Sequence, residues 1–186
     1  AVERHAPAAT EAVVDVTGVM GPPVRAMAEH APDRERVSFH PLFAPENAPG
    51  NVAVVADAPG PVTDELRASL AERGNRLFET TPAEHDETMA SVQAGAHAAI
   101  IAYALATEPI PEHFHTPVSA ALADLVDQVT HGSPQVYAEI QDAFEGAEDV
   151  AVAARRIADA DPAAFVALYR EAAGDGDDED DGTQDA

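Results

Sequence analysis

Cysteine and lysine are both absent from this chain of 186 residues, and all ten of its basic residues are arginine. Without cysteine there are no disulfides, no thiolate metal sites and no cysteine nucleophile. Without lysine there is no Schiff-base lysine and no phosphate-binding lysine of the P-loop type. The lack of cysteine also fits a cytoplasmic protein, which is the location we expect.

Long apolar runs are absent as well. The longest, residues 94–106, is interrupted by His97 and is shorter than the ~20 residues that a membrane-crossing helix needs. No basic segment precedes an apolar core, so we expect neither a signal peptide nor a membrane partner. Hydrophobic residues still make up 46% of the chain, enough for a core in one large or two small domains.

Positive charge is scarce, and the formal net charge is −24. Seven of the 34 acids lie in the last thirteen residues, so the rest of the chain carries 27 acids against ten arginines, a net charge of −17. An acidic surface spread over the whole chain repels nucleic acid and anionic lipid. With no lysine at all, it is typical of a halophilic protein that folds in concentrated salt.

This charge predicts salt-dependent stability. Like charges repel one another in the compact state, and dissolved ions screen that repulsion. We therefore expect the midpoint of thermal unfolding to rise as KCl is added. A midpoint that does not change with KCl would contradict the salt-adapted interpretation.

The first 82 residues alternate between strand and helix patterns. This alternation predicts an α/β fold, a partial Rossmann-like sheet layered with helices. The chain starts with Ala1 rather than Met and soon enters a buried strand, so we expect a further part of the sheet upstream. Strands are expected at 13–16, 37–39, 51–56 and 76–80, and helices at 22–31 and 63–73, the latter capped by Thr63.

From Thr81 onward only helical periodicity is found, beginning with a capping box at Thr81 and Glu84. The first helix is long and rich in Ala and Gly, which is typical of a dimer core. We expect an α/β domain at 1–82, an all-α dimerisation domain at 83–173 and a disordered acidic tail at 174–186. The expected helices are 82–107, 116–131, 134–145, 147–160 and 162–173.

Three polar residues in apolar surroundings are candidates for chemistry. His40 follows a strand, and ligands of open α/β sheets gather where strands end. The alternative is a turn histidine that bonds to the backbone. Gln93 and His97 share one helix face, where they either meet a ligand or satisfy each other across a helix interface. His85 lies ~120° around the helix from His97 and is not expected to share its ligand.

The other clusters of polar residues give weaker evidence for a functional site. Glu84 and Asp86 are explained by the positive end of their own helix. His113 and His115 offer two imidazoles but no third ligand, so we expect no metal site. No Gly-rich phosphate-binding turn occurs in the sequence.

Several stretches together resemble the prephenate dehydrogenases, including the arogenate dehydrogenases, over about residues 13–172. That family has the patterns His-Pro-x-Phe-Gly-Pro and Glu-His-Asp-x-x-Met-x-x-x-Gln, with a His four residues after the Gln. A Pro-x-x-Tyr-Ala-(Asp/Glu)-Ile stretch follows later. Here these are His40-Pro41-Leu42-Phe43-Ala44-Pro45, Glu84-His85-Asp86 through Met89 to Gln93 with His97, and Pro134-Gln135-Val136-Tyr137-Ala138-Glu139-Ile140.

The resemblance implies NAD- or NADP-dependent oxidative decarboxylation of prephenate to 4-hydroxyphenylpyruvate in tyrosine biosynthesis, by a homodimer. It implies that His40 is the catalytic base and that His97, Gln93 and Thr17 bind substrate. The cofactor would contact residues that follow the first two strands. These are Asp15, Thr17, Gly18 and Pro41.

The sequence departs from the family at three places. The family's Asp-x-x-Ser-Val-Lys reads Asp15 to Met20 here, with Gly18 for Ser and Met20 for Lys. The family often has a carboxylate-binding Arg in the helix that follows its Ser-Pro; residues 116–130 contain no Arg here, and Gln128 falls near that place. The Gly-rich dinucleotide turn is missing, so these 186 residues alone are expected to show no oxidoreductase activity.

Three alternatives stay open. An arogenate dehydrogenase would use the same scaffold. A non-catalytic dimeric helical module with a vestigial α/β half would explain the missing dinucleotide turn. A chorismate mutase suits the helices, although it needs basic residues around its substrate that this chain lacks.

Overall fold

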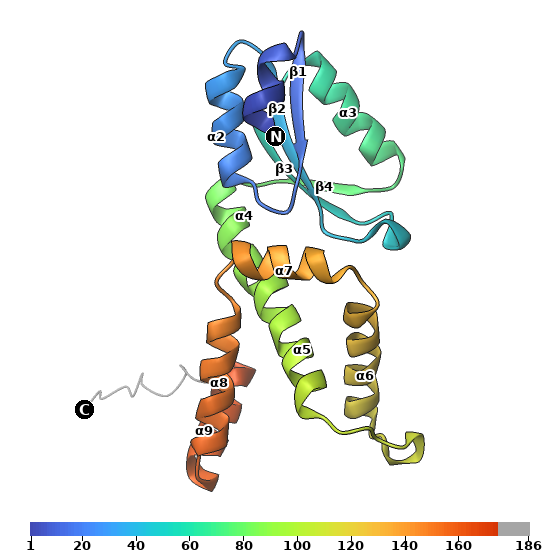
Figure 1. Ribbon diagram of the computed structural model, residues 1–186, viewed down its shortest axis with the longest axis vertical. Helices are drawn as coiled ribbons and strands as arrows, with labels where there is room; N and C mark the ends of the chain where they lie inside the picture. Colours follow the sequence, from blue (N-terminus) through green and yellow to red (C-terminus); the bar gives the residue numbers. More distant parts are fainter. Residues whose placement is uncertain (175–186) are drawn as a thin grey trace, which may run out of the picture.

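The computed structural model describes residues 1–174, and most of the acidic tail considered above lies outside them. A four-stranded mixed sheet forms the first part of the chain (Figure 1). Its order is β1-β2-β3-β4; β1 and β2 are parallel, β2 and β3 antiparallel, and β3 and β4 parallel. The strands are Ala12–Val16, Glu35–Pro41, Asn51–Ala58 and Arg76–Glu79.

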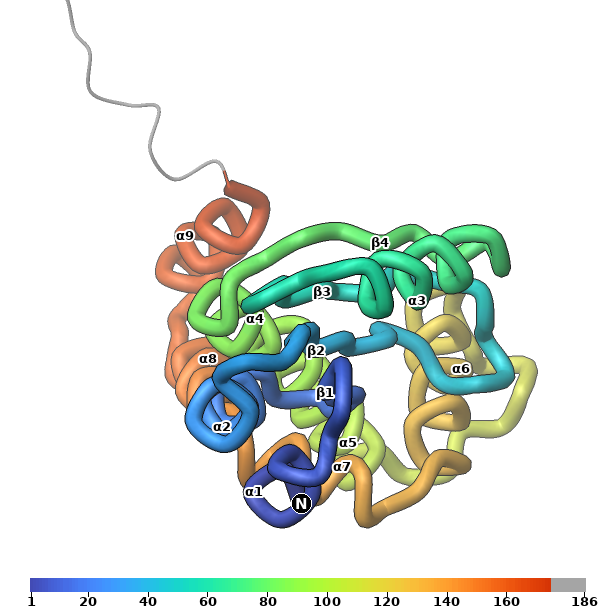
Figure 2. The backbone as a smooth tube through the Cα atoms, turned by 90° about the horizontal axis from the view of Figure 1, so that it is seen from above, coloured from blue at the N-terminus to red at the C-terminus, as the bar shows by residue number. Residues whose placement is uncertain are grey.

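Helices cover both faces of this sheet. The short α1 (Val2–His5) and α2 (Gly21–His30) lie on one face, and α3 (Pro61–Glu72) lies on the other, as Figure 2 shows from above. Alternate residues of β3 pack on opposite faces of the sheet. Ala53 and Val55 pack against α2, while Val52 and Val54 lie on the face that α3 covers. A half-covered sheet would alternate apolar with polar residues, so the continuous apolar run in β3 has a direct structural reason.

The strand β1 forms one edge of the sheet, and two of its apolar side chains on the face that carries α3 are partly uncovered. Val14 is 38% exposed and Val16 is 63% exposed. A natural edge strand is normally short, charged or covered. The predicted fold class, a partial Rossmann-like sheet followed by helices, is confirmed by the strand order and by the shared fold of a solved structure.

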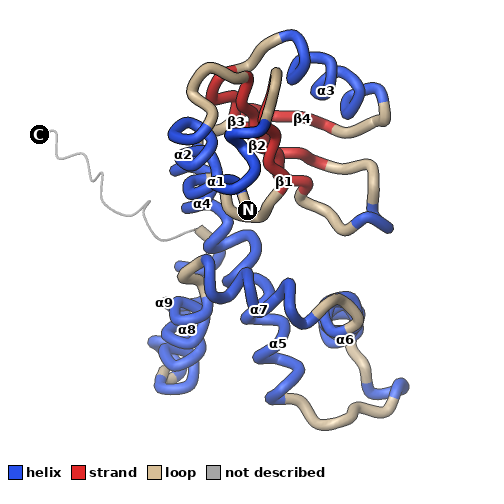
Figure 3. The backbone as a smooth tube through the Cα atoms, turned by 45° about the horizontal axis from the view of Figure 1, so that its top comes forward, coloured by secondary structure: helices blue, strands red, loops and turns tan. Residues whose placement is uncertain are grey.

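Helices account for the chain after β4 (Figure 3). A continuous helix runs through α4, the π-helical turn η3 and α5, and it lies between α6 on one side and the α8–α9 pair on the other (Figure 1). The bounds are α4 Pro82–Met89, η3 Ala90–Gly95, α5 Ala96–Ala106, α6 Pro117–Thr130, α7 Pro134–Ala143, α8 Ala147–Asp159 and α9 Pro162–Ala173, with short 3-10 turns at Ala6–Ala8, Pro45–Asn47 and Glu112–Phe114.

The predicted helix starts are close to the observed ones, with one correction. The helix assigned to 63–73 begins at Pro61, and Thr63 lies at its third position instead of capping it. The Gly60 backbone N–H donates to Thr63 Oγ1 at 2.9 Å. Proline is favoured at the first helical position because its missing N–H would have no partner there, and that signal locates the start better than the threonine does.

The continuous helix Pro82–Ala106 also corrects the expectation that no segment is apolar and long enough to cross a membrane. By length and composition alone it is apolar enough to cross a membrane, with a mean hydropathy of 1.3 over an 18-residue window, of which 11% is buried. A count of uninterrupted apolar residues ends at a polar residue, whereas a mean over a window tolerates isolated polar residues such as Gln93 and His97. Most of this apolar surface is uncovered in the single chain.

Candidate active site

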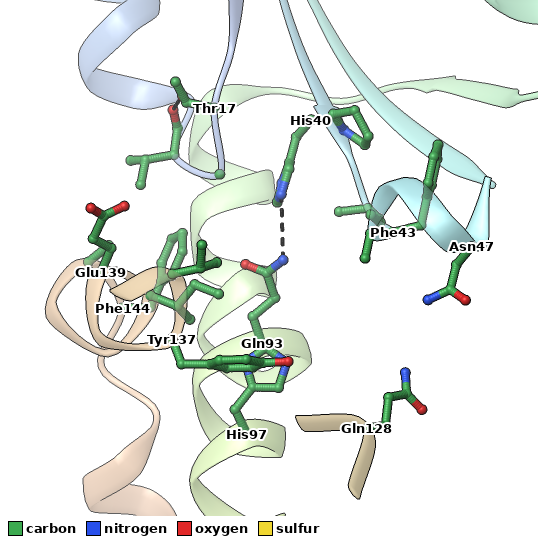
Figure 4. A pocket seen from close by; sticks show the side chains of 18 residues that line it. Thr17, His40, Phe43, Asn47, Gln93, His97, Gln128, Tyr137, Glu139 and Phe144 are labelled. Carbon is green, nitrogen blue, oxygen red and sulfur yellow. Dashed lines mark hydrogen bonds between the residues drawn. The ribbon is translucent and has the colours of Figure 1, made fainter. Parts of the chain in front are cut away.

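A pocket opens where the sheet meets the helices, and its cavity measures about 640 Å³. The parallel strands β1 and β2 end at its rim, and η3, α5, α6 and α7 close the other side (Figure 4). This is the location at which α/β sheets bind ligands. The lining residues are Thr17, Gly18, Val19, His40, Pro41, Leu42, Phe43, Ala44, Asn47, Gln93, His97, Gln128, Val136, Tyr137, Glu139, Ile140, Ala143 and Phe144.

His40 lies near the end of β2 and is 7% exposed. It points to the face of the sheet opposite Phe39 because side chains alternate along a strand. Its Nδ1 lies 2.9 Å from Nε2 of His85 on α4. Its Nε2 is turned toward the pocket, where Gln93 Nε2 approaches to 3.5 Å (Figure 4). Burial, with a further contribution from His85, lowers the pKa of His40 to about 4, although Asp86 opposes the shift. His40 is therefore neutral at pH 7.

His85 connects His40 to Asp86. Its Nδ1 lies 2.8 Å from Oδ1 of Asp86, and its side chain is 1% exposed. Asp86 also accepts hydrogen bonds from the backbone N–H groups of Met20 and Gly21, each at 2.9 Å. Asp86 thus binds the first turn of α2, whereas the sequence had suggested a role at the start of its own helix.

Gln93 belongs to the π-helical turn η3, in which one extra residue is inserted into the helix. Such turns leave a backbone carbonyl without its usual partner. Gln141 Nε2 donates to the Ala94 carbonyl at 2.9 Å and supplies one. Gly146, at the start of α8, lies so close to η3 that a Cβ atom there would be 2.2 Å from the Ala90 carbonyl oxygen. Two elements of the helical part therefore stabilise the turn that directs Gln93 to His40.

His97 lies one turn further along the helix and stacks edge-on against Tyr137, with ring centroids 4.7 Å apart. Two buried polar atoms at this wall have no hydrogen-bond partner among residues 1–174: Gln93 Oε1 and His97 Nδ1. Buried polar atoms are normally paired. Burial lowers the pKa of His97, so this residue offers neutral hydrogen-bonding groups to a ligand.

The other residues assigned from the sequence lie around the β1 end. Thr17, Gly18 and Pro41 line the pocket, and Gly18 lies beside His40 Nε2. Asp15 is buried below the pocket, where Oδ2 accepts from Ser38 Oγ at 2.8 Å. The Thr17 hydroxyl lies 3.1 Å from Asp15 Oδ2 and 2.8 Å from the Val19 carbonyl oxygen, so its hydrogen is directed away from the pocket.

Positive charge is missing from this lining. None of the lining residues is an arginine, and Glu139 is the one carboxylate among them. Gln128, near the position at which the sequence resemblance implies an Arg, reaches the pocket (Figure 4). Sequence reasoning missed several apolar and amide contributors because loops and a distant helix bring them together. These are Leu42, Phe43, Asn47, Tyr137 and Phe144.

Metal ligands do not cluster in the described part of the chain. Between residues 1 and 174, no three His, Asp or Glu side chains are arranged to hold a metal ion. The loop histidines His113 and His115 lie outside the pocket lining.

Known proteins are similar to this chain in sequence and in fold. No family model matches the chain. A 4-amino-4-deoxyprephenate dehydrogenase of Streptomyces pristinaespiralis is 32% identical over 164 residues, which cover 76% of this chain and 55% of that protein. The chain thus spans about half the length of this curated relative.

Solved structures share the fold. Prephenate dehydrogenase from Aquifex aeolicus superposes with a TM-score of 0.62 at 15% identity, covering 92% of this chain and 70% of that one. The structure of prephenate dehydrogenase from A. aeolicus in complex with hydroxyphenyl propionate and NAD⁺ superposes with a TM-score of 0.59 at 16% identity. The match covers 94% of this chain and 66% of that one. Synechocystis arogenate dehydrogenase superposes with a TM-score of 0.55 at 17% identity, and the match covers 94% of this chain and 72% of that one. The chain is thus similar in sequence to the Streptomyces enzyme and shares its fold with these prephenate and arogenate dehydrogenases.

Proposed function

We propose that this chain forms the substrate side of an NAD(P)-dependent dehydrogenase that oxidatively decarboxylates prephenate to 4-hydroxyphenylpyruvate. The observation that carries the proposal is the neutral imidazole of His40, which turns Nε2 into a pocket beside Gln93 and Gly18. This pocket has the size and location of a small-molecule site at the end of a parallel strand pair.

For this reaction the protein needs mainly to orient the substrate and to supply one proton acceptor. Prephenate carries a ring hydroxyl opposite a ring carboxylate, and loss of carbon dioxide after oxidation makes the ring aromatic. Neutral His40 accepts a hydrogen bond from that hydroxyl at Nε2 and takes its proton. Gln93 and His97 orient the ring from the helical side through their unpartnered polar atoms.

The chain has residues that could contact the nicotinamide end of the cofactor, but its sequence has no turn that would bind the cofactor phosphates. A bound nicotinamide would accept the hydride from the carbinol carbon. Gly18 and Pro41, at the ends of β1 and β2, leave room for such a ring beside His40. The sequence contains no Gly-rich turn for the cofactor phosphates, and the apolar edge of β1 is a suitable place for the strands that would carry one. The neighbouring structure that contains NAD⁺ supports a cofactor of this type.

A second candidate substrate is 4-amino-4-deoxyprephenate. The 32%-identical relative is named for it, and the pocket lining suits it because it contains Glu139 and no arginine. An amino group that carries a proton is tolerated better in such a lining than in one built around cations. The ring amine would take the place of the hydroxyl next to His40.

One assay separates these possibilities. The native protein, supplied with its dinucleotide-binding part and NAD⁺ or NADP⁺ in concentrated KCl, is given prephenate, arogenate or 4-amino-4-deoxyprephenate. Formation of reduced nicotinamide is then followed together with the aromatic product. We expect the highest kcat/KM with prephenate. A preference for the amino compound would favour the second candidate, and no turnover of any of the three would contradict the family reaction and favour a non-catalytic module.

We expect His97→Ala to weaken substrate binding more than turnover. The change removes one unpartnered nitrogen at the pocket wall and the ring that stacks on Tyr137, while His40 and its partners stay in place. KM should rise several-fold with little change in kcat. A fall in kcat at unchanged KM would instead assign His97 to the chemical step.

We propose that the protein is a homodimer formed by its helical part and centred on the helix Pro82–Ala106. This helix is apolar and mostly uncovered, and α5 contains no buried residue. Other apolar side chains of the helical part are exposed as well, among them Leu105 at 84%, Val118 at 71% and Tyr169 at 71%. Surfaces of this kind in one chain are typical of interaction sites.

Light scattering in concentrated KCl without detergent tests the dimer. At micromolar protein we expect twice the mass of one chain. A uniform monomer would contradict the proposal. Recovery only in detergent would contradict it too, and would identify Pro82–Ala106 as a membrane-binding helix.

A further inference from the structure

We infer that His85 and Asp86 are positioning residues: they select the tautomer of His40 that leaves Nε2 unprotonated and facing the pocket. This inference depends on the proposed function only in naming His40 as the base. The arrangement of protons that it describes is a property of the folded chain, with or without substrate.

The argument starts at Asp86, which as a carboxylate can only accept hydrogen bonds. Burial opposes its ionisation, but hydrogen bonds from the Met20 backbone, His85 and the Gly21 backbone outweigh burial and lower its pKa. Asp86 is therefore ionised at pH 7, and the proton of the 2.8 Å contact belongs to His85 Nδ1.

Each proton then determines the next one. When His85 carries a single proton and that proton is on Nδ1, Nε2 has a lone pair, which makes that nitrogen an acceptor. The 2.9 Å contact with His40 therefore requires a proton on His40 Nδ1. The lone pair of His40 is left on Nε2, where Gln93 Nε2 lies at 3.5 Å. A carboxylate that orients a catalytic imidazole through its second nitrogen is a recurring arrangement in enzymes.

Burial isolates this chain of contacts. His85 is 3% exposed, so water does not compete for either nitrogen. The rings of His40 and His85 meet edge-on with centroids 5.1 Å apart, and each nitrogen of His85 has one hydrogen-bond partner, His40 at Nε2 and Asp86 at Nδ1. The charged or titratable groups around His40 from the surrounding elements are Asp15 of β1, Asp86 and His85 on α4, Arg25 of α2 near Asp86, His97 on α5 and Glu139 on α7.

The same contacts hold the two parts of the chain together. Asp86 begins the helical part, yet its carboxylate binds the first turn of α2 in the sheet layer. The position of His85 is thereby fixed relative to the start of α2, because the carboxylate that binds His85 also binds the backbone of Met20 and Gly21. The imidazolium that forms when His40 takes a proton would be stabilised by the nearby negative charge of Asp86.

Nitrogen-15 NMR of histidine-labelled chain at pH 7 in concentrated KCl tests the inference without substrate or cofactor. We expect His40 in the form with the proton on Nδ1. His85→Phe keeps a buried ring but removes the acceptor, and we expect a large fraction of His40 to move its proton to Nε2. Glu87→Gln, a change from acid to amide at an exposed position of the same helix, should leave the signals of His40 unchanged.

Asp86→Asn gives a second measurement if His85→Phe does not fold. The amide oxygen can still accept from His85, so the tautomer of His40 should stay as in the wild type, but the negative charge is lost. In the native enzyme we expect kcat to fall by about tenfold or more with KM nearly unchanged. His40 protonated on Nε2 in the wild type, or a tautomer that does not respond to His85→Phe, would overturn the inference. An intact tautomer in a protein that does not turn over prephenate would instead overturn the proposed function alone.

Discussion

Substituting Asn for His40 is expected to reduce turnover of prephenate by roughly 10²–10⁴-fold, the usual cost of losing a general base, with little change in KM. The amide of Asn reaches the place of His40 Nδ1 and can donate to His85 Nε2, so the buried histidine keeps a partner. Nothing then replaces Nε2 as proton acceptor in the pocket. Steady-state kinetics with saturating cofactor measure the effect.

A matched control uses the same change at an exposed histidine. His113 lies in the loop after α5, outside the pocket lining, and His113→Asn should keep the wild-type kcat and KM. Turnover by His40→Asn at the wild-type rate would remove His40 from the chemistry, even though the similarity to the prephenate dehydrogenases would stand.

Gly146→Ala is expected to have the largest effect on stability. A Cβ atom at this position would lie 2.2 Å from the Ala90 carbonyl oxygen, 2.5 Å from the Gly95 nitrogen and 2.9 Å from Ala94 Cβ. Two of these atoms belong to the backbone of η3, which cannot rotate aside, so α8 must move away from the π-helical turn. Forced overpacking of this kind costs about 3 kcal/mol of unfolding free energy.

Denaturant unfolding in concentrated KCl measures this loss. Gly18→Ala is the control, because the nearest atom to its added Cβ would lie 3.6 Å away in ordinary contact. We expect its stability to stay close to that of the wild type. A stable Gly146→Ala protein would show that α8 is not packed against η3 as described.

Much of the fold was predictable because its signals are local. Proline at the first helical position and a capping residue before it mark the starts of α4, α6 and α9. The apolar run of β3 marks a strand covered on both faces. The β2–β3 reversal was not predicted, because the Pro-rich connection after His40 has no pattern that distinguishes a hairpin from a crossover.

The candidate site was predictable only in part. The motif resemblance selected His40, Gln93 and His97, and the structure brings all three to one pocket. The contact between His40 and His85 was missed because it joins residues 45 positions apart, and helix geometry says only that His85 and His97 point in different directions.

The π-helical turn was not visible in the sequence either. Residues 90–95 are compatible with an ordinary helix, and the inserted residue changes which side chains face the pocket beyond it. Its supports, Gln141 and Gly146, come from distant elements. A regular helical wheel therefore cannot place Gln93 relative to His85.

The pH dependence of kcat/KM tests the central claim, a neutral and buried His40 acting as base, most directly. The pKa of His40 is lowered from an ordinary 6.5 to about 4, so the base is unprotonated throughout the range above that value. Between pH 8 and pH 5, in concentrated KCl with prephenate and cofactor, the account predicts a nearly constant kcat/KM from His40, with the loss beginning only as the pH approaches 4. A tenfold fall per pH unit below about pH 6.5, the behaviour of a solvent-exposed imidazole, would contradict it.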